Sequence, residues 1–272
     1  MGCKVKEIVK VIETIAPPDL AEEWDNSGLL LGDPEAPVKR IMTAMDATEE
    51  VVGEAVDKKV DMICTHHPVM FKPIRSVTAA TAEGRLLLGL LGSGIALYSA
   101  HTSLDKAPGG VDDTLAGLLG LSDVRPLVSA YRGDGTLEPS FGRIGRLSGY
   151  RAFGEYLAEI RKRLKLDRID IVGSLECRIL TVASCAGAGG DFIGKARSSG
   201  ADLFITGEIK YHDAVTAAMD GIAVAAIGHY ESESPAMDVL NSRLQNALDA
   251  LKYNIEVIPS RLQGNPFRRF KE

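Results

Sequence analysis

The sequence lacks most of the features that mark secreted or membrane-spanning proteins. Its four cysteines form no C-x-x-C pair, so neither a zinc-finger spacing nor a disulfide framework is indicated. The N-terminal residues contain no apolar signal core. The longest uncharged apolar run, residues 86–100, contains three glycines and is shorter than the about 20 residues that cross a bilayer. We therefore expect a cytoplasmic protein that does not associate with a membrane.

The sequence also lacks an excess of basic charge. The chain has 31 lysines and arginines against 37 aspartates and glutamates, which gives a formal net charge of −6. Binding to the nucleic-acid backbone needs a basic field, so the charge balance argues against a nucleic-acid partner. The hydrophobic share of 45% is that of an ordinary globular protein. At 272 residues the chain can bury enough surface for one large or two moderate domains.

Hydrophobic spacing predicts alternating strands and helices. Helices are expected over 5–15, 49–58, 80–91, 111–119, 153–164, 189–198, 211–219 and 236–251, and strands over 41–45, 62–65, 95–99, 141–150, 179–184, 203–206, 222–227 and 254–258. Such alternation is typical of βαβ units. Residues 122–140 are polar and rich in proline and glycine, which indicates a linker. We predict two similar α/β domains with largely parallel or mixed sheets, formed by residues 1–125 with 235–272 and by residues 126–234.

A glycine-rich segment follows the strand predicted at 179–184. Residues 186–191 read Ala-Gly-Ala-Gly-Gly-Asp and precede a predicted helix, as a phosphate-binding loop would. The dinucleotide-binding fingerprint fails because Phe192 stands where its third glycine is needed. We interpret the segment as a tight strand-to-helix turn and keep anion binding as the alternative.

The chain has only five histidines, and all of them lie in short polar segments. Three of these segments directly follow a short apolar strand: Thr65-His66-His67-Pro68, His101-Thr102-Ser103-Leu104-Asp105 and Gly228-His229-Tyr230-Glu231-Ser232-Glu233. Ligand sites in open α/β sheets collect at the carboxyl ends of strands. Pro68 ends its strand, so both preceding imidazoles can turn toward one cleft. His229 and Glu233 lie close together either on one helical face or in a loop before Pro235.

Imidazoles and carboxylates in this combination suit borderline divalent cations such as zinc, iron(II) or manganese. Two such ions can share a glutamate at a separation of about 3.5–4 Å and activate a water molecule near neutral pH. Their charge exceeds that of two carboxylates, so the site would attract a small anionic substrate. The alternative is that each histidine is only a hydrogen-bonded loop residue.

These motifs resemble those of the Nif-three-like dinuclear metal-centre family, also named GTP cyclohydrolase 1 type 2. The three histidine segments take part in the resemblance, together with Trp24-Asp25-Asn26-Ser27-Gly28-Leu29 and Thr206-Gly207-Glu208-Ile209-Lys210-Tyr211-His212-Asp213. The motifs occur in the family's order from Trp24 to Glu233. The chain departs from the family at Ser103, where an asparagine is frequent, and this affects no expected metal ligand.

The resemblance implies a metal site in the cleft between two α/β domains and a homo-hexamer built as a trimer of dimers. Carried over residue by residue, His67 and Asp105 would ligate one ion, His66 and His229 the other, and Glu233 both. His101 and His212 would be residues of the cleft that contact substrate or orient a ligand.

The resulting hypothesis is a hydrolase with two divalent metal ions that acts on a nucleotide, with GTP as the substrate that the resemblance implies. Ring opening of guanine would release formate, and Glu233 or His212 would transfer protons. Lys210 and Lys72 are candidates to neutralise substrate phosphates, although such lysines more often contact only solvent. The alternatives are a dinuclear metal phosphoesterase or amidohydrolase, and a non-catalytic metal-binding hexameric scaffold or regulator.

Overall fold

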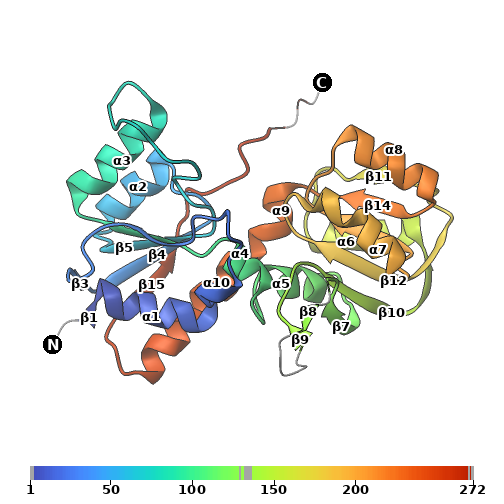
Figure 1. The fold of residues 1–272 in the computed structure, drawn as a ribbon, viewed down its shortest axis with the longest axis horizontal. Helices are drawn as coiled ribbons and strands as arrows, with labels where there is room; N and C mark the ends of the chain where they lie inside the picture. Colours follow the sequence, from blue (N-terminus) through green and yellow to red (C-terminus); the bar gives the residue numbers. More distant parts are fainter. Residues whose placement is uncertain (1–2, 129, 132–136, 269, 271–272) are drawn as a thin grey trace. The chain divides into compact units, whose positions relative to one another are not determined.

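The computed structural model describes residues 3–128, 130–131, 137–268 and 270. The chain forms two compact units, shown in Figure 1: unit 1 comprises residues 1–107 and 237–272, and unit 2 comprises residues 108–236. Helix α10 (Pro235–Ala250) begins in unit 2 and continues as part of unit 1. Within the described ranges, no helix combines the length and apolar character needed to cross a membrane.

Unit 1 is built on a five-stranded sheet. Its strands follow the order β15 (Glu256–Pro259), β4 (Arg40–Ala44), β5 (Met62–Thr65), β6 (Ala96–Ser99) and β2 (Gly28–Leu31). The first four strands are parallel to their neighbours, whereas β2 pairs with β6 in the antiparallel direction. A separate antiparallel pair joins β1 (Cys3–Lys4) to β3 (Pro37–Val38). The parallel core places the carboxyl ends of β4, β5 and β6 at one edge.

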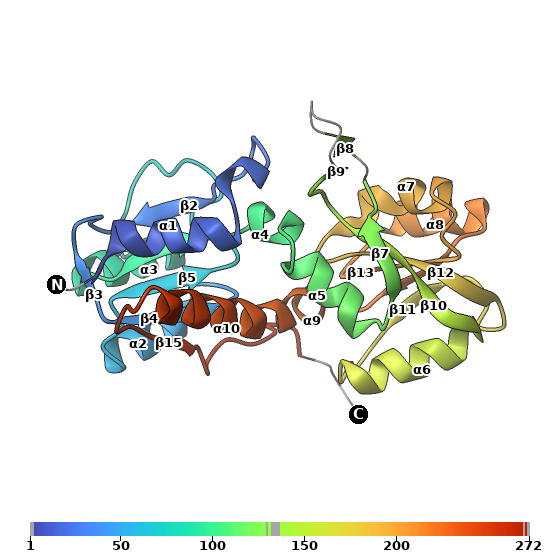
Figure 2. The ribbon, with the colours of Figure 1, turned by 90° about the horizontal axis from the view of Figure 1, so that it is seen from below.

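Helices cover both faces of this sheet. They are α1 (Val5–Ile15), the 3-10 turn η1 (Pro18–Leu20), α2 (Glu49–Asp57), α3 (Ala82–Ser93), α4 (Thr102–Lys106) and most of α10. Figures 1 and 2 show α2 and α3 on one face and α1 and α10 on the other. Met42, Ile63 and Leu97 pack toward α2 and α3. Because both faces are covered, the central strands are apolar on both sides.

Unit 2 repeats this arrangement with a six-stranded mixed sheet. The order is β11 (Asp170–Val172), β14 (Ala223–Ala226), β13 (Leu203–Thr206), β12 (Arg178–Cys185), β10 (Arg143–Ala152) and β7 (Ser122–Pro126). Strands β12, β13 and β14 are parallel, and the outer three pair in the antiparallel direction. A short hairpin joins β8 (Ala130–Tyr131) to β9 (Leu137–Glu138).

The helices of unit 2 also divide between the two faces of the sheet. They are α5 (Val111–Leu118), α6 (Phe153–Arg163), the 3-10 turn η2 (Gly189–Phe192), α7 (Ile193–Ser198), α8 (Tyr211–Asp220) and α9 (His229–Glu233). Leu203 and Ile205 pack with α5 and α6, while Phe204 packs with α7 and α8. Successive side chains of β13 thus enter opposite cores, as strand geometry requires.

The predicted α/β class with mixed sheets is confirmed, but the first domain boundary differs from the predicted one. It lies between residues 107 and 108 instead of after residue 125. Leu115 and Leu119 belong to the core of unit 2, and β7 pairs with β10 there. The prediction of a linker over 122–140 was therefore wrong for β7, an exposed edge strand whose polar residues hide its character. Residues 129 and 132–136 of that segment lie outside the described residues.

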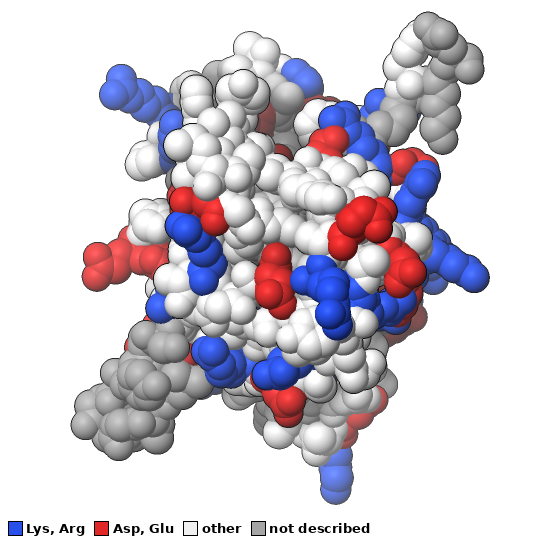
Figure 3. All heavy atoms as spheres, turned by 90° about the vertical axis from the view of Figure 1, so that its right-hand side faces the viewer, with Lys and Arg blue, Asp and Glu red and all other residues white. Residues whose placement is uncertain are grey.

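Charged side chains are mixed on the surface shown in Figure 3. Lysine and arginine side chains lie beside aspartate and glutamate side chains over the described part of this face. A polyanion binds a surface on which basic side chains form a continuous patch. On the described part of this face the basic side chains lie among acidic ones.

A buried carboxylate joins three segments of unit 2. Asp112 of α5 accepts hydrogen bonds from the backbone N–H of Gly142, at 2.6 Å, and from that of Ala186, at 2.9 Å. Burial raises the pKa of Asp112 to about 6, although the nearby Arg143 guanidinium and both N–H groups act in the opposite direction. The side chain thus fixes α5 to the start of β10 and the end of β12 through a group that is costly to ionise.

This raised pKa predicts a specific pH dependence of stability. The folded protein retains a proton that the unfolded chain releases between about pH 4 and 6, so the contribution of Asp112 to the free energy of unfolding falls as pH rises through this window. Asp112→Asn cannot titrate. We expect the free energy of unfolding of this variant, relative to that of the wild type, to be higher at pH 7 than at pH 4.5 by about 1–3 kcal/mol. Urea unfolding of both proteins with EDTA measures this, and a difference that does not change with pH would contradict it.

Candidate metal centre

The candidate ligands of unit 1 follow three adjacent parallel strands. Ala44 of β4 pairs with Thr65 of β5, and Thr65 pairs with Ser99 of β6, so the three strands end at the same level of the sheet. The chain continues in register beyond them, since the backbone N–H of His66 donates to the carbonyl of Ala44 at 3.1 Å. Residues that follow these strands are therefore brought to one edge.

Three imidazoles lie together at this edge. The ring centroids of His66 and His67 are 4.8 Å apart, and His101 lies 5.3 Å from the first and 5.6 Å from the second. One nitrogen from each ring lies within 4.8 Å of the others, a spacing that can hold a metal ion. His66 is fully buried. The structure therefore places His101, predicted only as a cleft residue, beside two predicted ligands.

A carboxylate lies beside this group. Asp105 belongs to α4, the short helix that begins directly after His101, and its Oδ1 lies 3.5 Å from Nε2 of His66. Helix α4 turns the chain back, so a residue four positions beyond His101 reaches the same edge. His66 and His67 follow β5 and Asp105 lies on the helix after β6, so the predicted ligands of unit 1 meet at one edge of the sheet.

Each of these imidazoles is oriented by an oxygen at Nδ1. His66 contacts the carbonyl oxygen of Ala100 at 3.2 Å, His67 contacts Oδ1 of Asp46 at 2.9 Å, and His101 contacts Oδ1 of Asp25 at 2.7 Å. An imidazole that donates its Nδ1 proton in this way presents the Nε2 lone pair toward the centre. Metal-ligating histidines in proteins are held by carboxylates and carbonyls in the same manner.

The Asp25 carboxylate is the most strongly bound of these partners. It is buried, and it accepts hydrogen bonds from Ser27 Oγ at 2.6 Å, from Thr102 Oγ1 at 2.6 Å and from the backbone N–H of Thr102 at 3.1 Å. Burial acts to raise the pKa of Asp25, but the hydrogen bonds from His101, Ser27 and Thr102 outweigh it and hold that pKa well below its ordinary value. Asp25 is therefore an anion that fixes the orientation of His101.

Unit 2 brings its candidate ligands together in the same way. Cys185, Thr206 and Ala226 are paired neighbours on β12, β13 and β14, so these strands also end at one level. The residues beyond them stay in register, since the N–H of Gly228 donates to the carbonyl of Gly207 at 2.9 Å. The loops after the three parallel strands then carry the polar residues.

His229 and Glu233 lie on one face of α9. Their Nε2 and Oε2 atoms are 3.1 Å apart, and Nδ1 of His229 contacts Oε1 of Glu208 at 3.0 Å. The sequence allowed either a helix or a loop here, and the structure shows a helix that ends before α10 begins at Pro235. As in unit 1, an oxygen at Nδ1 leaves Nε2 as the candidate ligand atom.

Gly187 shapes the space beside this pair. Its backbone has φ +61°, and a Cβ on it would lie 2.2 Å from Oε1 of Glu233 and 3.4 Å from Nε2 of His229. Its N–H donates to Ser232 Oγ at 2.9 Å, and that hydroxyl donates to the carbonyl of His229 at 2.7 Å. The glycine-rich turn after β12 therefore makes room for the ligand pair, a role that its sequence did not reveal.

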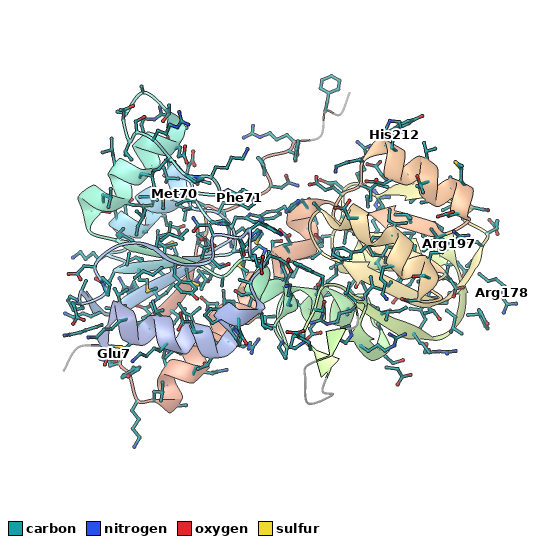
Figure 4. The ribbon with its side chains drawn as sticks, in the orientation of Figure 1. Glu7, Met70, Phe71, Arg178, Arg197 and His212 are labelled. Atoms are coloured by element: carbon teal, nitrogen blue, oxygen red, sulfur yellow. The ribbon has the colours of Figure 1, made fainter. Side chains whose placement is uncertain are left out.

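Two further predicted residues lie on or next to α8. His212 is exposed and its ring packs against that of Tyr211, with centroids 5.3 Å apart. Figure 4 labels His212 at the surface of unit 2. Lys210 is exposed at the start of this helix, where its backbone N–H donates to Asp213. Among the described residues, the groups able to hold a metal ion include neither side chain. Their catalytic and substrate-binding roles stay predictions.

Sequence reasoning missed the carboxylates that orient the histidines. Asp46 lies two residues beyond the end of β4, and Glu208 lies two residues beyond the end of β13. The signal was present, because both follow short buried strands just as the histidines do. Asp25 lies in a motif that contributed to the family resemblance, but its sequence offers no clue that it contacts His101 across 76 positions.

The kinds of donor found at these strand ends are those that bind a borderline divalent cation. Neutral imidazole nitrogens with one or two carboxylates are the ligands that zinc, iron(II) and manganese share. The oxygen atoms at Nδ1 favour the tautomer in which Nε2 is available to a metal ion. The chain thus has histidine and carboxylate groups that can hold a metal ion.

Comparisons with known proteins agree with these observations. The family model described as Duf34/NIF3 (NGG1p interacting factor 3) matches residues 3–266. A GTP cyclohydrolase 1 type 2 homolog of Clostridium acetobutylicum is 33% identical over 268 residues, which cover 98% of this chain and 99% of that protein. The NIF3 homolog of Schizosaccharomyces pombe is 32% identical and covers 96% of each chain.

A solved structure shares the fold over the whole chain. The crystal structure of a Bacillus cereus protein related to NIF3 matches with a TM-score of 0.92 at 25% identity, and the match covers 99% of this chain and 100% of the other. The family resemblance seen in the sequence motifs is thereby confirmed. This chain belongs to the Duf34/NIF3 family.

Proposed function

We propose that this chain is a dinuclear metal-dependent hydrolase that acts on a nucleotide. The proposed metal ligands are His66, His67 and Asp105, which belong to unit 1, and His229 and Glu233, which belong to unit 2. The observation that carries the proposal is the set of imidazoles whose Nδ1 atoms are held by oxygens. An oxygen at Nδ1 orients each ring so that Nε2 can bind a metal ion. Carboxylates beside the rings are therefore what a metal site requires.

The side chains around the centre have separate tasks. When bound, the ions would supply Lewis acidity, which lowers the pKa of water and neutralises negative charge on the substrate. His101 accepts or returns a proton at Nε2, because Asp25 fixes its other nitrogen at 2.7 Å. Glu233 is buried beside His229 and is the second candidate for proton transfer.

Names of relatives favour GTP as the substrate. Several relatives at 30–35% identity carry the name GTP cyclohydrolase 1 type 2 homolog. In such a reaction water adds to the ring carbon between the two nitrogens of the imidazole part of guanine. One carbon–nitrogen bond of that carbon then breaks and leaves a formamide, and a second water hydrolyses the formamide, so that the carbon leaves as formate. A small anionic nucleotide also suits a centre with excess positive charge.

The test is a product analysis with metal-loaded protein. We expect formate release from GTP, together with a change in the ultraviolet spectrum as the purine ring opens. Glu233→Ala, prepared and loaded in the same way, is the control. Equal formate from both proteins, or none from either, would contradict ring opening. Release of phosphate without formate would instead identify a phosphoesterase.

The relatives include a protein named only as a NIF3 homolog, and a metal-binding scaffold without turnover is the competing proposal. We propose that the chain forms a homo-hexamer in either case. Light scattering with and without metal separates the two ideas when combined with the product analysis. A hexamer that requires metal but releases no product from any nucleotide would favour the scaffold.

The contact between Asp46 and His67 gives a prediction about metal affinity. Asp46→Asn replaces the carboxylate at Nδ1 by an amide, and we expect metal affinity to fall by about 10- to 100-fold because the imidazole becomes less basic and less well oriented. Competition against a coloured chelator measures this affinity. Asp57→Asn, at an exposed position on α2, is the matched control and should leave the affinity unchanged. Equal affinity of both variants would exclude an orienting role for Asp46.

A further inference from the structure

Two large aromatic side chains are exposed beside the histidines of unit 1. Trp24 is 58% exposed and Phe71 is 50% exposed, and their ring centroids lie 5.8 Å apart. Each also lies next to His101, at 6.3 Å and 6.2 Å respectively. His101 in turn lies 5.3 Å from His66. An apolar ring surface therefore continues directly from the imidazole cluster.

The loops that carry these rings are tied together and to the centre. The side-chain amide of Asn26 donates to the carbonyl of Met70, which joins the loop after η1 to the loop after β5. Asp25 contacts both His101 and Thr102. Figure 4 labels Met70 and its aromatic neighbour in the loop that follows β5. Both aromatic residues are thus next to an anchored residue, so their exposure does not arise from untethered loops.

The ring geometry favours a flat ligand. The planes of Trp24 and Phe71 are inclined by 52°, and each is nearly perpendicular to the ring of His101, at 76° and 82°. The two aromatic rings therefore do not stack on each other. A planar ring could stack on one of them and meet the other edge-on, which is a preferred aromatic arrangement. Exposed aromatic surface beside convergent polar groups is typical of a ligand site.

We propose that Trp24 and Phe71 form an aromatic clamp that binds the heteroaromatic ring of the substrate, a nucleobase, and holds it against His101. The proposal rests on the proposed function, which makes the histidines the reacting centre. Stacking of a base on an aromatic side chain contributes about 1–3 kcal/mol. A sugar phosphate without a base gains nothing from the clamp. The clamp thus selects nucleosides and nucleotides over simple phosphoesters.

Trp24 is the only tryptophan of the chain, so its fluorescence reports on the clamp directly. We expect guanosine and GTP to quench this fluorescence with saturation, because an indole in direct stacking contact with a base fluoresces less. Ribose phosphate at the same concentrations should leave it unchanged. A parallel titration of N-acetyltryptophanamide corrects for light absorbed by the base. The titrations are made with metal-loaded protein and repeated with EDTA.

Variants at the second ring test the geometry. Phe71→Ala should weaken guanosine binding by about 5- to 100-fold, the equivalent of the stacking energy of one base. Phe71→Tyr keeps an aromatic face and should bind as the wild type does. Phe267→Ala removes an aromatic side chain that is 75% exposed elsewhere in unit 1, and it should have no effect. Circular dichroism of each variant establishes that it is folded.

The outcomes separate the clamp from the proposed function. Saturable quenching that is weakened by Phe71→Ala supports the clamp even if no formate is released. Formate release without quenching would overturn the clamp alone. Quenching by ribose phosphate equal to that by guanosine would also overturn it, because the ring would not be what is recognised. Dissociation of an oligomer by Phe71→Ala, with guanosine binding unchanged, would show that the rings form a subunit contact and would reject the proposal.

Discussion

His66→Ala is expected to abolish stabilisation of the protein by divalent metal. The imidazole is fully buried, and the carbonyl of Ala100 holds its Nδ1, so Nε2 is the ligand atom that the substitution removes. Loss of a ligand should exceed the about 10- to 100-fold loss of affinity that follows the loss of an orienting partner. A metal present at 100 times its dissociation constant stabilises the wild type by about 2.7 kcal/mol. For the variant we expect the same metal concentration to raise the free energy of unfolding by close to zero.

Urea unfolding with and without zinc or manganese measures this stabilisation, and elemental analysis of the purified proteins measures the bound metal. Each protein is its own reference, so any loss of stability caused by the cavity at His66 cancels. His212→Ala is the control for metal content, because this imidazole is exposed and lies outside the ligand groups. Stabilisation of His66→Ala by metal to the wild-type extent would remove His66 from the ligand set.

The histidines could be selected from sequence because two independent signals coincide on them. His66 and His229 each follow a short strand of apolar residues, which periodicity identifies, and each belongs to a cluster of polar residues. The carboxyl ends of parallel strands collect ligand sites. The sequence therefore placed the candidate residues at strand ends correctly. It could not order the strands, and the order decides which side chains meet.

Asp46 and Glu208 illustrate this limit. Both are exposed acidic residues, a kind that is common on any surface, and neither stands out in the sequence. Their role depends on register: β4 lies beside β5, so Asp46 reaches His67 across 21 positions. The same argument applies to β13 beside β14 for Glu208 and His229. Neighbouring strands must be known before these contacts can be derived.

The missed strands have a related cause. Residues of β7 are mostly exposed and those of β2 are only partly buried, because both strands lie at the edge of their sheets. An edge strand buries less surface and does not need a continuous apolar run. Hydrophobic periodicity is therefore strong for the parallel central strands and weak at the edges. The first domain boundary was misplaced for this reason, because β7 was interpreted as part of a linker.

Gly187→Ala is expected to damage the ligand pair of unit 2 far more than it damages the fold. A Cβ at this position would lie 2.2 Å from Oε1 of Glu233, so the carboxylate must move. The side chain of Glu233 is 6% exposed, which leaves little space for it near His229. We expect metal affinity to fall by at least about 10-fold, as for a ligand that has lost its orientation. Chelator competition measures the affinity, and formate release measures any activity.

Backbone strain would complicate this result without a matched control. Gly187 has φ +61°, and alanine in the left-handed region costs about 1–2 kcal/mol wherever it occurs. Gly200 has φ +83°, but a Cβ there would meet no atom within 4 Å. Gly200→Ala therefore introduces the backbone strain without displacing the Glu233 carboxylate. This variant should lose a similar amount of stability and still bind metal as the wild type does. Equal loss of metal in the two variants would attribute the effect to strain, and full retention by Gly187→Ala would show that Glu233 needs no such space to act as a ligand.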